Sequence, residues 1–571
     1  MSLAKAIKLM QPVTFSFLVV MAFEFIFGFT GTTLIIEGAA IRHIVFIIAF
    51  VSTAFLCILY MLEHKIALVS HNKSSSIFRY FSRLQWSVSI LLVSMLVSMT
   101  LIPYLRNNSL QLAKSEALDS FIMLALFLPL SFLIRWRLFN YKLYGKILFA
   151  FMAIFSAMHI ILYIGQSLNQ NYIEMVLGHI QRRLDAISGV QSIFPQIILG
   201  HNGYPRVIFT TSIYLVYSIY SILAETVKNR LINSIVIAIH IAAILTTMTK
   251  SIWLGILIGL FCYVIMMFGF SKSRGRFLLK TSLTVLAICG YILLLNYSVF
   301  HNQVYLRLSN TFMISSSSVT ESEVSDTTDN KQIEKKKTET DATVESNQAT
   351  VVEDDHLFQN NEQAAAGESD DTKITQTNMI SSSSTAESEG SGSAENKQTE
   401  KKKTETDGTV ATNQATADED NQVPQNNEQA AAVESNDIKI TQTRLLLNEW
   451  LKHPILGNGF GSYIKNYIRS QEAVFSYEMQ APALLMKVGL LGVSLVLLTV
   501  FMAFYNVLHN SYLHPKAKAA WVYLTIAFIM AVQTNPLLLS YPGISIFVII
   551  LVLSENNSGS KVASIQKTGQ V

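Results

Sequence analysis

The sequence is poor in charge and in cysteine for its length. Of its 571 residues only 14% are charged, whereas soluble globular proteins carry about a quarter. This deficit excludes an ordinary soluble enzyme, and a hydrophobic share of 51% with a mean hydropathy of +0.37 indicates a membrane protein. The three cysteines, Cys57, Cys262 and Cys289, lie in apolar runs and fit neither a disulfide framework nor a zinc site.

The sequence also lacks recognisable cofactor motifs. It has no P-loop, no dinucleotide fingerprint and no group of Cys, His, Asp or Glu at metal-ligand spacing, so we expect no cofactor and no nucleic-acid partner. Ionisable residues inside the apolar runs are few, whereas carriers use charged or broken helices at the membrane midplane. Those few are Glu24, Asp119, His159, Glu225 and His240.

Long apolar runs are what the sequence has in abundance. Because a helix needs about 20 apolar residues to cross a bilayer, these runs predict an all-α polytopic membrane protein with about 12 transmembrane helices. The runs lie at roughly 14–34, 42–62, 85–105, 117–135, 146–165, 207–225, 231–248, 251–270, 279–298, 481–505, 519–537 and 540–555.

Lys and Arg in the short connections predict the orientation. With the N-terminus in the cytoplasm, the inner segments hold twenty basic residues and the short outer connections hold four. Both termini then lie in the cytoplasm, and two large loops, at about 166–206 and 299–480, lie outside the cytoplasmic (inner) membrane. The four outer basic residues are Arg42, Arg106, Lys114 and Lys250.

The second outer loop contains an acidic tandem repeat. The string "EKKKTETD" begins at Glu334 and again at Glu400, an offset of 66 residues that other strings share. Residues 314–443 hold 10 Lys against 27 Asp plus Glu, a net charge of −17. Such a polar segment buries too little apolar area to offset its ordering entropy, so we predict that it is disordered, as a spacer or a tolerated length change. It separates an N-terminal membrane domain (1–298, about nine spans) from a C-terminal one (481–571, about three spans and a short tail), within the loop 299–480.

Three segments of the second half carry a recognisable pattern. The first, "RLLLNEWLKHPILGNGFGSY", begins at Arg444 and closely matches the "R…W……HPLLGVGPGNF" signature of the O-antigen ligase and O-antigen polymerase superfamily. The second, "LTTMTKSIWLGILIGLF" (245–261), is similar to that family's "LTxSRGAWLGLLIGL", with Lys250 where Arg is usual. The third, "YEMQAPALLMKVGLLG" (477–492), resembles "HNxYLQLLAETGLLG", with Glu478 at the His position and Lys487 at the usual Glu position.

The resemblance implies a polytopic glycosyltransferase of the GT-C type. Such enzymes take glycan from a polyprenyl-diphosphate donor at the outer face and need neither a metal nor a nucleotide sugar. The ligase branch joins the glycan to a lipid A core, and the polymerase branch joins it to another lipid-linked repeat unit. Glu478 departs from the ligase pattern and favours a polymerase of capsule, exopolysaccharide or O-antigen repeats. The expected partners are the lipid-linked oligosaccharide, membrane lipid, a chain-length regulator and a flippase.

The same resemblance gives the outer-face residues their predicted roles. Cations neutralise the charge that develops on the leaving diphosphate, since guanidinium binds phosphate in a bidentate fork. Glu478 accepts the proton of the acceptor hydroxyl, or else is the structural ion-pair partner of a nearby Arg. His453 precedes Pro454 and is expected to shape the turn beside the substrate. The predicted substrate-binding residues are Arg182, Arg183, Arg206, Lys250, Arg444 and His453.

Two other functions remain open at this stage. A ligase would use the same fold and donor but a different acceptor. A 12-span polysaccharide flippase or secondary transporter would belong to another class, and it should show two similar halves, which the sequence does not.

Overall fold

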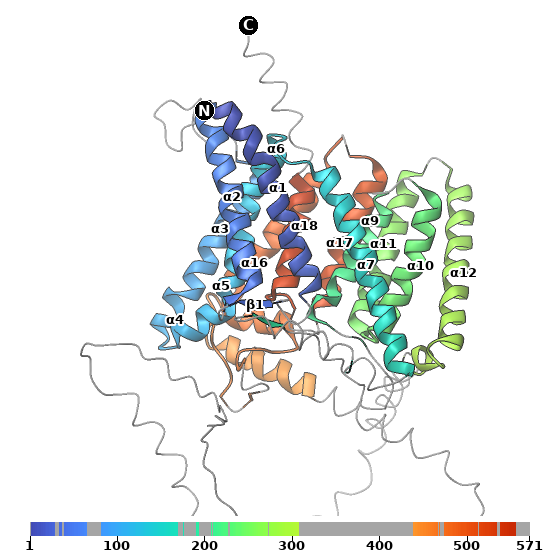
Figure 1. Ribbon diagram of the computed structural model, residues 1–571. Helices are drawn as coiled ribbons and strands as arrows, with labels where there is room; N and C mark the ends of the chain where they lie inside the picture. Colours follow the sequence, from blue (N-terminus) through green and yellow to red (C-terminus); the bar gives the residue numbers. More distant parts are fainter. Residues whose placement is uncertain are drawn as a thin grey trace, which may run out of the picture. The chain divides into compact units, whose positions relative to one another are not determined.

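The computed structural model of the chain is built mostly of α-helices (Figure 1). All the residues it describes belong to one compact unit formed by residues 1–314 and 425–571. The described residues are 2–28, 34–36, 39–64, 81–168, 175, 190–192, 207, 209–225, 229–271, 273–307, 438–465, 467–468, 473–511, 513–533 and 537–555.

Apolar helices account for almost the whole of this unit. The elements are α1 (Leu3–Phe27), α2 (Ile41–Glu63), α3 (Arg83–Met99), α4 (Leu101–Leu105), α5 (Leu110–Ala125), α6 (Phe127–Arg135), α7 (Tyr141–Leu168), η2 (Thr210–Ile213), α9 (Tyr214–Leu223), α10 (Arg230–Thr246), α11 (Lys250–Phe270), α12 (Arg274–Ser298), α16 (Gln480–Leu508), α17 (Pro515–Val532) and α18 (Tyr541–Glu555), with three short strands, β1 (Leu34–Ile36), β2 (Ala39–Ala40) and β3 (Val190–Ser192).

Within the described ranges, nine helices are long and apolar enough to cross a membrane. Two of them are composite, Arg83–Leu105 from α3 and α4 and Leu110–Arg135 from α5 and α6. Three shorter apolar helices, Thr211–Leu223, Leu231–Thr246 and Tyr541–Glu555, coincide with the other three predicted runs. The prediction of a mostly helical, polytopic membrane protein is therefore confirmed. Helices suit this environment because each satisfies its own backbone hydrogen bonds where water is absent.

The most extensive helix pairing in the described chain joins α11, from the middle of the sequence, to α17, near its C-terminal end. In α11, Gly255 and Gly259 face α17 so closely that a Cβ atom on Gly255 would lie 2.6 Å from the carbonyl oxygen of Ala527. Small residues four apart let two helices approach to backbone contact, a common device in membranes. The pairing packs the second matched segment against the C-terminal helices.

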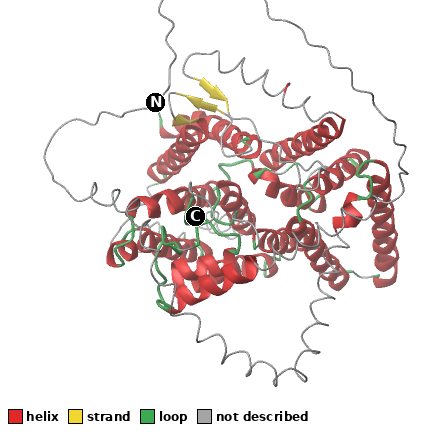
Figure 2. Ribbon diagram, turned by 90° about the horizontal axis from the view of Figure 1, so that it is seen from below, coloured by secondary structure: helices red, strands yellow, loops and turns green. Residues whose placement is uncertain are grey.

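The strands form the one departure from an all-helical fold in the described chain. β2, β1 and β3 make a small antiparallel sheet in the order β2-β1-β3, in which Ile35 pairs with Ala40 and with Gln191 (Figure 2). The sheet joins the connection before α2 to a strand of the first predicted outer loop. Two connections far apart in sequence thus meet beside the first turn of α2.

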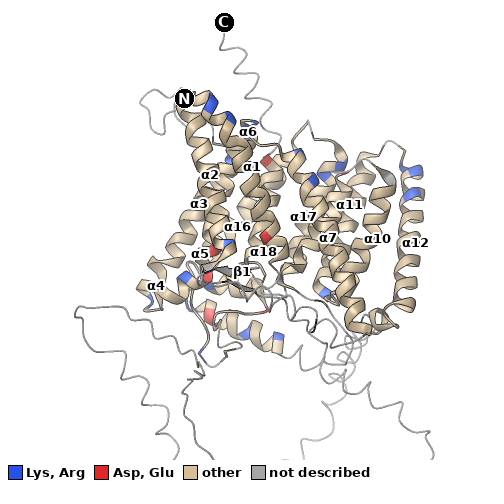
Figure 3. Cartoon of the chain, in the orientation of Figure 1, with Lys and Arg blue, Asp and Glu red and all other residues tan. Residues whose placement is uncertain are grey.

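The helix bundle has two ends, the loop end and the terminal end. The loop end carries the helix at 438–451 and the turn that follows it, and the terminal end carries the start of α1 and the end of α18 (Figure 1). Lys and Arg residues lie mainly near helix ends and seldom along the helices (Figure 3). At the terminal end, Arg135 Nη2 donates to Glu555 Oε2 over 2.8 Å, and both side chains are buried.

The boundary of the predicted disordered segment needs one correction. Residues 438–443 belong to a helix that continues to residue 451, so the prediction of disorder up to 443 is wrong for these six residues. This helix carries the apolar residues Ile438, Ile440, Leu446 and Trp450. Its Gln442 and Leu446 lie one helical turn apart, and both are buried. The rest of the repeat, 314–437, lies outside the described residues.

Candidate functional site

The described residues include four of the seven predicted site residues. Lys250, Arg444, His453 and Glu478 all belong to them, and all four come from the loop end. The other three, Arg182, Arg183 and Arg206, lie outside the described residues.

The first matched segment forms a helix followed by a glycine-rich turn. The helix at 438–451 ends before Pro454, and the indole Nε1 of Trp450 donates to the Pro454 carbonyl over 2.9 Å. Gly457, Gly459 and Gly461 have φ angles of +71°, +84° and +77°, which residues with a side chain rarely adopt. The repeated glycines are therefore needed for the shape of this turn.

The turn is hydrogen-bonded along the start of α16. The backbone N–H groups of Asn458 and Gly459 donate to the carbonyls of Met486 and Lys487, each over 2.8 Å. In return, Leu490 and Leu491 donate to the carbonyls of Pro454 and Ile455 over 2.9 and 3.0 Å. This exchange is possible because α16 is kinked at Gly489, where φ is +65° and ψ −173°. The first and third matched segments are thus one hydrogen-bonded structure.

The same turn is also attached to the N-terminal helices. The Phe460 N–H donates to the Ser98 carbonyl of α3 over 2.9 Å, and the Asn108 side chain donates to the Asn458 carbonyl over 2.9 Å. A Cβ atom on Gly459 would lie 2.8 Å from Pro103 of α4. The turn therefore bridges residues about 350 positions apart in sequence.

A buried ion pair lies beneath the turn. Lys487 Nζ of α16 contacts Glu116 Oε1 of α5, and each side chain is only 4% exposed. The second carboxylate oxygen, Glu116 Oε2, accepts the Gly461 N–H over 2.7 Å, and Lys487 Nζ also donates to the Phe475 carbonyl over 2.7 Å. Every oxygen of the carboxylate has a donor, which a buried charge requires.

The segment that carries Glu478 is fixed on both sides of that residue. The Tyr477 hydroxyl accepts the Ile464 N–H over 2.8 Å, and the Met479 N–H donates to Gln442 Oε1 over 2.9 Å. Burial raises the pKa of Tyr477 to about 12, so its phenol stays protonated at neutral pH. Glu478 itself is half-buried between these two anchors. Its backbone is therefore held by hydrogen bonds of both neighbouring residues.

Cations from three parts of the chain gather at the start of α11. Lys250 begins this helix, and the charges of Arg307 and Lys439 lie near enough to act on its ammonium group. The N-cap residue Thr249 makes no side-chain capping hydrogen bond to the helix. An uncapped helix N-terminus with three cations is a favourable place for an anion. Arg307 and Lys439 were not among the predicted site residues.

Arg444 and His453 are not among the charged groups that act on Lys250. Arg444 is exposed on the helix at 438–451, one residue past Thr443, whose hydroxyl donates back to the Lys439 carbonyl over 2.8 Å. His453 is half-buried at the end of that helix. Loss of hydration lowers the pKa of His453, and the nearby charge of Arg106 lowers it further. His453 is thereby kept neutral, which fits its predicted role in the turn.

Sequence reasoning missed Glu116 as an intramembrane acid. The apolar run was placed at about 117–135, whereas α5 begins at Leu110, so Glu116 lies within the span. A signal was available in Lys487, which sits in an apolar run and needs a counter-charge when buried. Asp119 lies one turn further along α5 and is half-exposed. Its Oδ1 atom lies 3.7 Å from His43 Nε2.

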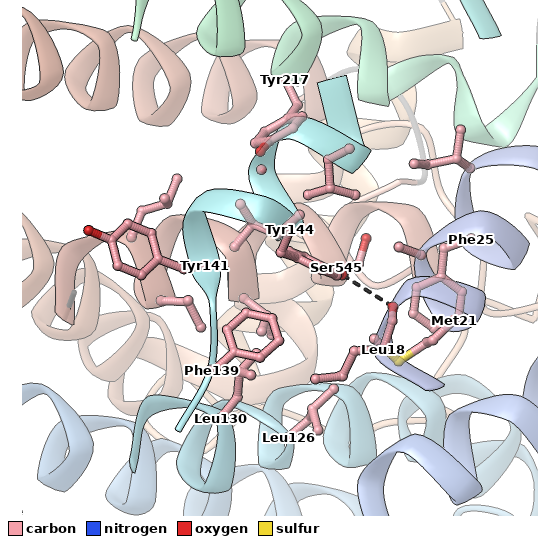
Figure 4. A pocket seen from close by; sticks show the side chains of 18 of the residues that line it. Leu18, Met21, Phe25, Leu126, Leu130, Phe139, Tyr141, Tyr144, Tyr217 and Ser545 are labelled. Atoms are coloured by element: carbon pink, nitrogen blue, oxygen red, sulfur yellow. Dashed lines mark hydrogen bonds between the residues drawn. The ribbon is translucent and has the colours of Figure 1, made fainter. Parts of the chain in front are cut away.

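An apolar cavity of about 100 Å³ opens among α1, α6, α7, α9 and α18 (Figure 4). Leu18, Met21 and Phe25 line it from α1, and the Tyr144 hydroxyl donates to the Leu18 carbonyl over 3.4 Å beside it. None of its lining residues is charged, and the residues of the loop-end site do not line it. The cavity therefore lacks the cations that would neutralise a leaving diphosphate.

Comparison of the chain with family models, curated proteins and solved structures found no match.

Proposed function

We propose that this protein is a polymerase of lipid-linked polysaccharide repeat units, with 12 membrane spans and a GT-C-like fold. It would transfer glycan from polyprenyl diphosphate at the outer face of the cytoplasmic membrane, with both termini inside. The observation that carries the proposal is the convergence at the loop end of the three segments that resemble the O-antigen ligase and polymerase superfamily. The first and third are hydrogen-bonded together, and the second supplies Lys250 near Lys439 of the helix that precedes the turn.

The chemistry of such a transfer fits the residue types at this end. The acceptor hydroxyl attacks the anomeric carbon, the bond from that carbon to the diphosphate oxygen breaks, and polyprenyl diphosphate leaves with the bonding electron pair. The cations at Lys250, Arg307 and Lys439 are placed to stabilise the charge on the leaving group. Glu478 is the proposed acceptor of the hydroxyl proton, with Arg444, Arg182, Arg183 and Arg206 as further cations on the outer side.

The test is the glycan-lipid profile of a host strain that lacks the chain. Polyprenyl-linked material is extracted and sized beside the surface polysaccharide. Single repeat units on lipid at the outer face, with no long polymer, are the expected result. Long polymer stranded on the lipid carrier would show a ligase instead, and single units trapped at the inner face would show a flippase. An unchanged profile would overturn the glycan function altogether.

Residue roles are tested by returning variants to the same strain. Glu478→Gln and Lys250→Gln should each be present at the normal amount of protein. With either variant, lipid-linked single units should accumulate and no long polymer should form. Arg137→Gln, an exposed cation at the terminal end, is the matched control and should restore polymer fully. Restoration of normal polymer by both Glu478→Gln and Lys250→Gln would show that the proposed site is wrong.

A further inference from the structure

Glu116 lies between two loop segments, the glycine-rich turn and the segment 473–478 that carries Glu478. One carboxylate oxygen accepts the N–H of Gly461 in the glycine-rich turn. The other holds Lys487, whose ammonium group also donates to the carbonyl of Phe475, three residues before Glu478. A single buried side chain of α5 thus contacts the turn directly and is connected to the segment 473–478 through Lys487.

We propose that Glu116 is a positioning residue that holds the glycine-rich turn and the segment 473–478 in place against α5. This inference rests on the proposed function, because the segment it positions carries the acid assigned to proton transfer. Glu116 does not reach the substrate itself, since its side chain is only 4% exposed. Its effect is transmitted through two hydrogen-bonded arms, the Gly461 N–H and the Lys487 ammonium.

Burial makes these two arms strong and directional. A charged acceptor forms shorter and stronger hydrogen bonds than a neutral one, and no water competes for a carboxylate this deeply buried. The adjacent backbone has little freedom to adjust, because a Cβ atom on Gly461 would lie 2.5 Å from the Ala113 nitrogen of α5. The turn therefore sits directly on the helix turn that presents Glu116.

Two substitutions separate the arms. Glu116→Gln keeps a carbonyl that can accept the Gly461 N–H but removes the negative charge that holds Lys487. Glu116→Leu removes both connections at similar size. We expect Glu116→Gln to leave the turn in place and displace only the 473–478 segment. Glu116→Leu should also loosen the turn, which its remaining hydrogen bonds to α16 and α3 still hold near its place.

The experiment uses the full-length protein purified into lipid nanodiscs, with Cys57, Cys262 and Cys289 replaced by Ser. Spin labels at Lys114→Cys on α5 and Lys452→Cys beside the turn, both exposed, report the distance between them. A narrow distribution should persist in Glu116→Gln and broaden in Glu116→Leu. Glu555→Gln, a buried carboxylate at the terminal end, is the matched control and should leave the distribution narrow.

Kinetics with the host's lipid-linked repeat unit supply the second readout. In Glu116→Gln, kcat per folded molecule should fall between about tenfold and a hundredfold with KM little changed, because misplacement of a reacting group costs this much. Glu555→Gln should leave kcat per folded molecule unchanged. A folded Glu116→Leu with an unaltered distance distribution, or a Glu116→Gln with full kcat, would overturn the inference. If the wild-type protein does not polymerise, the polymerase function fails, while the spin-label distances still decide whether Glu116 positions the turn.

Discussion

The part of the chain that the structure describes contains two buried ion pairs, at opposite ends of one composite helix, Leu110–Arg135. At the terminal end, Glu555 accepts from Arg135, from the Ser82 hydroxyl and from Asn506, all of which lie at or near the ends of regular helices. At the loop end, Glu116 and Lys487 instead contact the irregular backbone at Gly461 and Phe475. One pair joins helices to one another, and the other joins helices to the segments that carry the candidate chemistry.

This difference shows why similar charges can have different purposes. A buried ion pair adds little net stability over a well-packed apolar pair, because desolvation offsets the attraction. The terminal-end pair therefore fixes which helix ends meet. The loop-end pair fixes where a turn and its neighbour sit, and this placement is where function is sensitive to small displacements.

The largest expected effect is the loss of a single cation from either pair. Lys487→Met and Arg135→Met each leave a buried carboxylate without its main partner, which costs about 3–5 kcal/mol. Both should lower the thermal midpoint of unfolding in detergent and the amount of folded protein by similar amounts. A Lys487→Met protein as stable as wild type would contradict the assignment of Glu116 as a buried anion.

The next largest effect is the loss of stability when the strained glycine of the loop end is replaced. Gly489→Ala places a Cβ atom 2.3 Å from the Ile455 carbonyl oxygen at a φ and ψ that only glycine adopts readily. We expect a loss of at least about 1–3 kcal/mol from backbone strain, measured as unfolding free energy.

A second glycine provides the control for this substitution. Gly290 lies in α12, and a Cβ atom there would meet nothing within 4 Å. Gly290→Ala should be neutral or stabilise by up to about 1 kcal/mol, because alanine loses less entropy in a helix. Equal losses in both variants would show that the kink at Gly489 is not a special site.

Neutral replacement of each whole pair sharpens the comparison further. The double variants Glu116→Gln/Lys487→Met and Arg135→Met/Glu555→Gln remove both charges, so most of the stability lost in the single variants should return. Activity per folded molecule should be normal only in the terminal-end double variant. At the loop end the Phe475 carbonyl still lacks its donor, and a several-fold deficit in polymer formation should remain. Full activity in both doubles would mean that the loop-end pair only supports folding.

The helical architecture was predictable because its signal is local. Each span satisfies its own backbone, so a run of apolar residues is sufficient, and each predicted run coincides with an apolar helix. The glycine-rich turn was also foreseeable from its residues. The pairing of Lys487 with Glu116 was not, since it joins positions 371 apart and depends on how α5 and α16 pack. The cations Arg307 and Lys439 were likewise brought to Lys250 by tertiary structure alone.

The smallest expected effect concerns pH and is confined to the loop end. Burial and then Arg106 lower the pKa of His453 below its ordinary value of about 6.5. The folded protein then binds fewer protons at this ring than the unfolded chain, so this part of the stability is present above pH 6.5 and is lost as the pH falls through the lowered pKa. Arg106→Gln should raise the pKa of His453 and reduce that acid-side loss, measured as the unfolding midpoint between pH 7.5 and 5. In the His453→Gln background, the acid-side loss of stability should be the same with Arg or Gln at position 106, because position 453 no longer carries a titrating ring. A difference that persists in the His453→Gln background would place the pH sensitivity elsewhere in the chain, and the two ends would then differ only in their ion pairs.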